Sequence, residues 1–129
     1  SFFAVRLHPE DDLLEGMVNA LKEAGITSAA IVTCVGSLYV CNVRLAAAIE
    51  TASWNEELEI VSLVGTFSDN GPHVHISVSE EGGHVKGGHL LKGSLIRTTA
   101  EVVFAVLDSQ YHFTREFDKN TGWNELVVH

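Results

Sequence analysis

Three histidines in the segment from Gly71 to Leu91 have spacings that suit a metal site. His73 and His75 lie two residues apart in a run with a strand-like pattern, and His89 follows after a turn. Successive side chains of a strand point to opposite faces, so the paired rings share one face, about 7 Å apart at Cβ. Imidazole nitrogens at that separation can bind one ion at about 2.0–2.1 Å. The returning segment would then supply the third ligand.

The same pair has a plainer interpretation, because the chain holds seven histidines. A His-x-His pair also occurs as the half-exposed polar face of an ordinary strand. The third histidine favours the metal site, since Gly87 and Gly88 before His89 are typical of a strand whose backbone approaches another segment closely. His84 and His112 are further candidate ligands, although a turn and a strand face are positions that favour exposure to solvent.

The chemistry of such a set is that of a divalent cation. Three neutral imidazoles suit zinc first, with iron, nickel or manganese as alternatives, and they leave a fourth position for water or substrate. Glu101 interrupts an apolar run and is the candidate catalytic residue, as a general base, as a partner of a ligand histidine or as a ligand itself. Its plainer interpretation is an exposed strand acid. Arg44 likewise is either an exposed or ion-paired strand residue or an anion-binding group.

The apolar pattern predicts the elements that position these residues. A helix is expected from Glu10 to Ala24, with acids in its first turn and Gly25 just beyond its end. Residues 46–55 are polar and are expected to be irregular, with Trp54 as a cover residue, and residues 68–71 form a hairpin turn. Period-two and β-branched patterns predict strands at 2–7, 26–38 with an extended continuation over 39–47, 58–67, 73–78, 95–107, near 111–113 and at 126–128. The expectation is a compact α+β fold, a single domain over residues 1–129, with mainly antiparallel strands and one helix packed on the sheet.

Composition excludes some classes of function. The formal net charge is −9, from 17 acidic and 8 basic residues, and the basic ones are scattered, so direct nucleic-acid binding by this domain is disfavoured. No apolar run approaches the roughly 20 residues that span a bilayer, and no signal peptide is recognised, so we expect a soluble chain with no membrane contact. Cys34 and Cys41 lack a Cys-x-x-Cys spacing and are expected to be reduced, buried thiols of a cytoplasmic protein.

Several motifs together resemble the plant-and-prokaryote-conserved (PPC) domain, also called the domain of unknown function 296 family. They occur in the family's order and span most of the chain: Val35-Gly36-Ser37-Leu38, Glu59 to Phe67, Pro72 to Ser77, Gly87-Gly88-His89-Leu90 and Thr98 to Val103. The resemblance implies a homotrimer of α+β domains. In prokaryotic members it also implies a metal ion on three histidines, which map onto His73, His75 and His89.

In plants the resemblance implies nuclear proteins in which this domain follows AT-hook motifs and regulates transcription. The present chain departs from that branch twice. No Arg-Gly-Arg-Pro core occurs, and the plant Gly-Arg-Phe-Glu-Ile-Leu run is replaced by Glu56-Glu57-Leu58-Glu59-Ile60-Val61. An acid in place of the arginine reverses the local charge and disfavours the same partners. A nuclear location would therefore depend on a flanking segment.

Three functions remain open. The first is a metal-binding domain, with or without metal-dependent chemistry on a small molecule. The second is an oligomeric protein-interaction module, in which Phe2, Phe3, Trp54 and Trp123 are available for an interface. The third is DNA binding of the AT-hook protein type. An ion site that solvent can reach would distinguish the first from the second.

Overall fold

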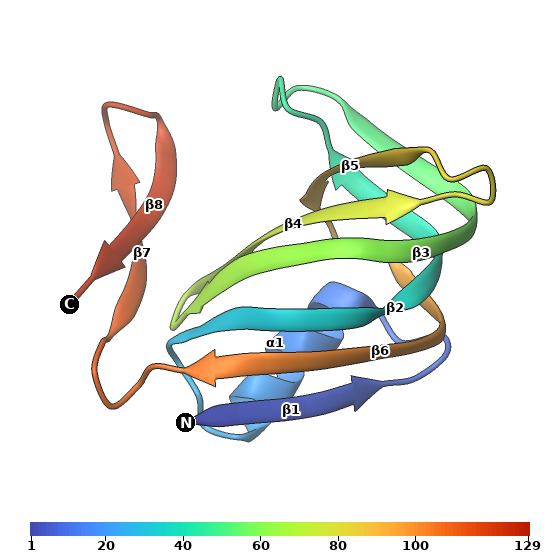
Figure 1. Cartoon of the computed structure of the whole chain (residues 1–129). Coiled ribbons are helices and arrows are strands. Elements are labelled where there is room, and N and C mark those ends of the chain that lie inside the picture. Colours follow the sequence, from blue (N-terminus) through green and yellow to red (C-terminus); the bar gives the residue numbers. More distant parts are fainter.

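One helix and eight strands make up the chain, and the computed structural model describes all residues from 1 to 129. Figure 1 shows a curved main sheet with the helix against one face and a separate hairpin beside it. The elements in order are β1 (Phe2–Leu7), α1 (Leu13–Glu23), β2 (Ala29–Arg44), β3 (Thr51–Ser68), β4 (Gly71–Ser79), β5 (Val85–Leu90), β6 (Leu95–Val106), β7 (Phe113–Asp118) and β8 (Trp123–Val128).

The main sheet has six strands in the order β1-β6-β2-β3-β4-β5, and every pairing in it is antiparallel. Strand β2 also pairs with β5, through Val43 with Leu90 and Arg44 with His89. This second pairing closes β2, β3, β4 and β5 on themselves at one end of the sheet (Figure 1). The predicted α+β class is confirmed, and the closure brings the last residue of β2 next to the histidine strands.

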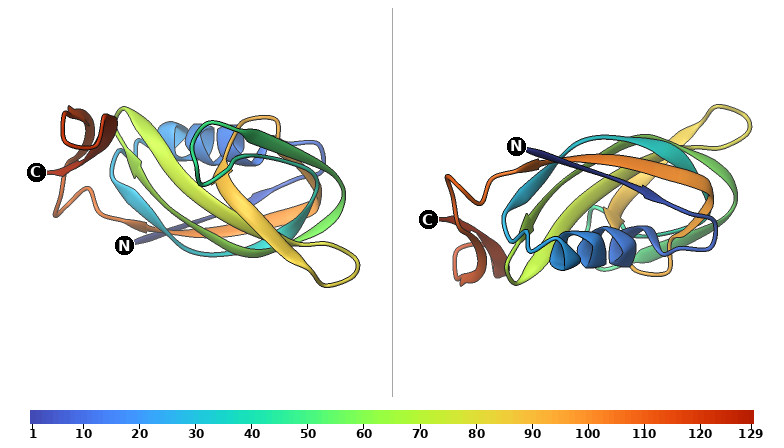
Figure 2. Two further views of the ribbon diagram at one scale, coloured as in Figure 1. Left: turned by 90° about the horizontal axis from the view of Figure 1, so that it is seen from above. Right: turned by 90° about the horizontal axis from the view of Figure 1, so that it is seen from below.

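Helix α1 lies against one face of the main sheet (Figure 2), and its apolar stripe is buried. The buried stripe consists of Leu13, Leu14, Met17 and Leu21. The helix begins later than the acids suggest, because Asp12 is its N-cap and accepts a hydrogen bond from the Glu15 backbone N–H at 3.0 Å. Glu10, at φ 77°, cannot continue a right-handed helix.

The core lies between α1 and the inner face of the sheet. It is one cluster of 21 buried residues, with Phe104, Leu38, Leu58 and Ile96 among its largest fully buried side chains. Both cysteines are free thiols, as expected, and burial raises the pKa of each to about 11, so they stay protonated. No helix in this structure has both the length and the apolar character needed to cross a membrane.

The predicted strand and its extended continuation form one strand over residues 29–44. Two other segments differ from the prediction. The terminal strands are longer than expected, at 113–118 and 123–128 instead of near 111–113 and at 126–128. In the stretch 46–55, residues 46–50 are irregular as expected, but β3 begins at Thr51 and pairs with β2 in the register Trp54 with Cys41. Trp54 packs on the core as expected, with the Lys86 ammonium 5.1 Å from its ring centroid. Cross-strand pairing with an apolar neighbour has here outweighed the low strand propensity of the local sequence.

Strands β7 and β8 form a two-stranded sheet of their own, which stands beside the main sheet in Figure 1. Asn70, in the β3–β4 turn, ties it to the body. Its amide nitrogen donates to the Arg115 carbonyl at 2.8 Å, and its amide oxygen accepts from the Arg115 backbone N–H at 2.7 Å. This two-point contact fixes where the hairpin side chains lie.

Candidate metal centre

The three predicted ligands come from two neighbouring strands. Strand β4 alternates as expected, with Val74, Ile76 and Val78 buried on the inner face while the histidines occupy the outer face. His89 lies on β5 directly opposite His75 in the antiparallel register. Cross-strand neighbours have Cβ atoms about 4.5–5.5 Å apart, so this register alone brings the third ring to the pair.

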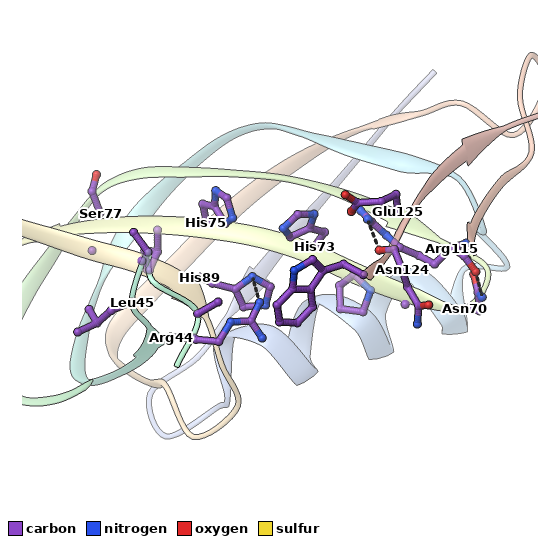
Figure 3. A pocket seen from close by; sticks show the side chains of 18 residues that line it. Arg44, Leu45, Asn70, His73, His75, Ser77, His89, Arg115, Asn124 and Glu125 are labelled. Carbon is purple, nitrogen blue, oxygen red and sulfur yellow. Dashed lines mark hydrogen bonds between the residues drawn. The ribbon is translucent and has the colours of Figure 1, made fainter. Parts of the chain in front are cut away.

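The rings face one another closely enough to share an ion. The candidate ligand nitrogens of His73, His75 and His89 all lie within 4.8 Å of one another, and the ring centroids are 4.9, 5.2 and 5.7 Å apart (Figure 3). Two nitrogens that bind one tetrahedral ion at about 2.0–2.1 Å lie about 3.4 Å apart. Small side-chain rotations would bring the three nitrogens to that separation. The donor set therefore fits a divalent ion.

The protonation state of the ring set also suits a metal. Desolvation, with a further contribution from the nearby Arg115, lowers the pKa of His73. Desolvation and the Arg44 guanidinium lower the pKa of His89 to about 4. At neutral pH both rings therefore carry a free lone pair, which a metal ligand needs. His75 is the exposed member of the set, so solvent reaches the centre.

Close backbone approach explains the two glycines before His89. A Cβ on Gly87 would overlap the carbonyl oxygen of Ile76 on β4. A Cβ on Gly88 would lie 2.7 Å from the carbonyl oxygen of Arg44 on β2. Any larger residue would push β5 away from one neighbour or the other, and His89 would move with it. The sequence-based interpretation of these glycines is confirmed.

Arg44 is the last residue of β2 and lies opposite His89. Its Nη2 is 3.3 Å from His89 Nδ1, and its guanidinium carbon lies 5.0 Å from the ring centroid of Trp123 on β8. Arg44 thus links the histidine strands to the hairpin. It is neither freely exposed nor paired with an acid.

The histidines line a pocket of about 1010 Å³ whose opposite wall is the β7–β8 hairpin. The hairpin contributes Arg115, Trp123, Asn124 and Glu125, and Glu125 is the one acid in the lining. Arg115 Nη2 donates to Thr66 Oγ1 at 3.0 Å, and its Nη1 donates to the Asn124 carbonyl at 3.3 Å. Sequence reasoning missed Arg115 and Glu125 as site residues. In the sequence they are two isolated charged residues of the terminal segment, and such residues are typical of an exposed strand face.

The structure does not bring Glu101 into this pocket. Glu101 is exposed on β6, opposite Arg6 of β1 and Val35 of β2, and its Oε2 accepts a hydrogen bond from Thr99 Oγ1 at 3.3 Å. It lines a separate shallow depression. Its predicted catalytic role stays a prediction.

The remaining histidines lie elsewhere. His84 is in the β4–β5 turn with its side chain 88% exposed, and its Nδ1 lies 3.0 Å from Glu80 Oε1. His112 stacks near His129, with ring centroids 5.9 Å apart, beside the hairpin. None of these joins the three-histidine cluster.

Comparison with known proteins decides the family. The sequence model of the Plants and Prokaryotes Conserved (PCC) domain matches residues 1–108. The chain belongs to this family. The match ends before the β7–β8 hairpin, so the PCC domain proper supplies the histidines and Arg44, while residues beyond it supply the opposite wall of the pocket.

Two curated relatives are proteins named "Bifunctional protein GlmU" from Synechococcus sp. strains JA-3-3Ab and JA-2-3B'a(2-13). They are 38% and 37% identical to this chain over 127 residues, which is 98% of the chain. The chain spans about a fifth of the length of these curated relatives, since the match covers 20% of each.

Solved structures agree with the PCC fold. A hypothetical protein from Salmonella cholerae-suis is 32% identical, with a TM-score of 0.95 over 100% of this chain and 93% of that one. A protein from Archaeoglobus fulgidus described as metal-containing is 27% identical, with a TM-score of 0.84 over 98% of this chain and 93% of its own.

Proposed function

We propose that this PCC domain binds one divalent metal ion, zinc first among the candidates, through His73, His75 and His89. The observation that carries the proposal is the meeting of three imidazoles, with ligand nitrogens all within 4.8 Å of one another, at the wall of an open pocket. The metal content of the 27% identical Archaeoglobus protein supports it. Three histidine ligands leave a coordination position free, as in catalytic and unlike structural zinc sites.

The chemistry that fits is metal-dependent reaction of a small polar molecule. A bound zinc ion would supply Lewis acidity for a water molecule or a carbonyl group. The chain's own residues would orient the molecule and manage charge and protons. Arg44 and Arg115 flank the histidines, and Glu125 is the pocket acid available to hold a proton. For Glu101 to act, it would have to reach the centre from another subunit, because β6 lies three places from β4 in the sheet and Glu101 does not line the pocket of its own chain.

We also propose the homotrimer that the family resemblance implies. Supporting it is a group of valines on the outer side of β2 and β3, whose side chains are more than half exposed: Val32, Val35, Val61 and Val64. Val64 lies opposite His75, so the apolar surface adjoins the metal centre. Contiguous exposed apolar residues on a sheet mark an interaction surface. Analytical ultracentrifugation tests this, with Val64→Asp expected to give monomers and Val85→Asp, at the β5 edge, as the control.

Direct DNA binding has the least support. The net charge is −9, and three of the eight basic residues are already paired with acids: Lys86 with Glu56, Lys92 with Glu15 and Arg97 with Glu57. Duplex binding depends on clustered cations that replace counterions. The free thiols agree with a cytoplasmic location, which we propose on that ground.

Elemental analysis of the untagged protein tests the metal proposal. We expect about one ion per chain in the wild type and in His84→Ala, the exposed control, and none in His73→Ala or His89→Ala. A folded wild type that takes up no zinc, iron, nickel or manganese would exclude the metal function. The interaction module would then be the better hypothesis.

A further inference from the structure

Charge is distributed unequally between the pocket and the rest of the chain. The chain carries a net charge of −9, yet two of its eight basic residues, Arg44 and Arg115, line the pocket with Glu125 as the only acid. Neither arginine has a carboxylate partner within ion-pair distance, whereas Lys86, Lys92 and Arg97 each have one. The pocket is therefore positive before any metal ion binds, in a molecule that otherwise repels anions.

Arg115 is held in place by hydrogen bonds that use only some of its donors. The Asn70 amide clamps its backbone from both sides, and Thr66 and Asn124 accept from its two terminal nitrogens. Its Nε is buried and has no hydrogen-bond partner. A guanidinium has five donors in a rigid fork that matches a carboxylate or phosphate. The two hydrogen bonds to Asn124 and Thr66 use two of these five donors, and a positioned fork with donors to spare at a pocket wall is suited to an anion.

The contact between Arg44 and His89 has a consequence for metal binding. A guanidinium only donates, so in that contact His89 Nδ1 must be the acceptor and Nε2 must carry the proton. A neutral imidazole has only one ring nitrogen whose lone pair can accept a hydrogen bond or bind a metal ion. If Nδ1 held the ion, it could no longer accept from Arg44. If Nε2 held the ion, Nδ1 would carry the proton and again could not accept. In either case Arg44 would lose its hydrogen bond to His89.

We propose that the pocket binds a small organic anion beside the metal ion, with its carboxylate or phosphate group held by Arg115 and by Arg44, which the metal releases from His89. This inference rests on the proposed metal function. The freed Arg44 stays close to the open coordination position because β2 and β5 are paired at that residue. The volume of about 1010 Å³ suits a small molecule, and the overall acidity disfavours a polyanion such as nucleic acid.

Titration calorimetry with matched probes tests the anion site. Benzoate and phenyl phosphate share a ring and differ in the anionic group, and benzamide is the uncharged control. We expect the zinc-loaded protein to bind one or both anions and not benzamide. Arg115→Met should weaken binding about 10- to 100-fold, the usual range for loss of charge-assisted hydrogen bonds. Arg115→Lys should recover part of the loss, and Arg97→Met, at an exposed arginine on β6, should bind like the wild type.

Arg44→Met tests the release step, since it keeps the length of the chain and removes the donor. We expect this variant to bind zinc at least as tightly as the wild type, and to lose anion affinity only when zinc is bound. In a Trp54→Phe background Trp123 is the single tryptophan, and its emission reports on the guanidinium above its ring. Zinc should change that emission, and Arg44→Met should abolish the change.

Several results would overturn the inference. They are a zinc-loaded protein that binds neither anion, benzamide binding equal to benzoate, equal affinities in Arg115→Met and Arg97→Met, or weaker zinc binding in Arg44→Met. A wild type that binds no zinc would exclude the proposed metal function. Anion binding at Arg115 would then be measured on the metal-free protein. Benzoate binding that Arg115→Met abolishes would support that site, and no binding would exclude it.

Discussion

The two faces of β4 differ in almost every physical property although they alternate within one strand. Toward the core, Val74, Ile76 and Val78 are 2%, 3% and 0% exposed. Toward the pocket, His73 and His75 stand beside His89 with their nitrogens free for an ion. One face is closely packed and apolar, and the other is open and polar.

This difference separates stability from chemistry. Burial of the inner face contributes free energy of folding in proportion to the apolar area removed from water. The outer face contributes little, because its rings are partly hydrated and unpaired with acids. A substitution on one face should therefore change one property and leave the other nearly intact, and the following predictions test that separation.

The largest expected effect is on metal occupancy. His75→Ala should abolish metal binding, since two histidines remain where three are needed to hold the ion. In the presence of a chelator its free energy of unfolding should stay within about 0.5 kcal/mol of the wild type, as for other exposed positions. Metal analysis with urea denaturation measures both quantities. A variant that keeps one ion per chain would contradict the assignment of the ligands.

A substitution on the inner face of β4 should lower stability and leave metal binding intact. Ile76→Ala removes a 3% exposed side chain from the core, so the free energy of unfolding should fall by about 2–5 kcal/mol. The folded fraction should still bind one metal ion. Val85→Ala, at a 57% exposed position at the start of β5, is the matched control and should have a small effect on unfolding. Loss of metal from folded Ile76→Ala would show that the two faces are coupled.

The stability of the metal-free protein should depend on pH because burial lowers the pKa values of His73 and His89. His89 has its pKa lowered to about 4, and that of His73 is also lowered, whereas unfolded histidine titrates near about 6.5. Above about pH 6.5 these rings are neutral in both states and add nothing to the pH dependence. Below it only the unfolded state binds protons, so stability should fall until about pH 4. In a chelator, His89→Asn should show a shallower fall than the wild type, and equal slopes would contradict this interpretation.

The smallest effect is expected at Glu101. Glu101→Gln should retain the metal, because its carboxylate lies on β6 outside the histidine pocket. Its free energy of unfolding should change by no more than about 0.5 kcal/mol. Metal analysis and denaturation check this, and loss of the ion would show that Glu101 reaches the centre, from its own chain or from a neighbour.

The local pattern was sufficient for much of the fold. The alternation in 73–78 predicted which side chains enter the core, and the glycines at 87 and 88 predicted a close backbone approach that the structure confirms. The extent of β3 was not predictable in the same way. Residues 51–55 become strand because residues 40–44 of β2 pair with them across the connection at 45–50, and the pattern within 51–55 alone does not reveal that pairing.

The sequence by itself determined the period-two faces, the helix and the hairpin turn, because each depends on residues within a few positions of one another, and it supplied the three histidine candidates through residue type and spacing. The tertiary structure decided which charged groups join them. Arg44 meets His89 only because β2 closes onto β5, and Arg115 and Glu125 enter the pocket only because Asn70 ties the terminal hairpin to the β3–β4 turn. Glu101 stays outside the pocket because the sheet order places β6 three strands from β4. Strand register and sheet closure depend on contacts between residues far apart in the sequence, so a local pattern cannot predict them.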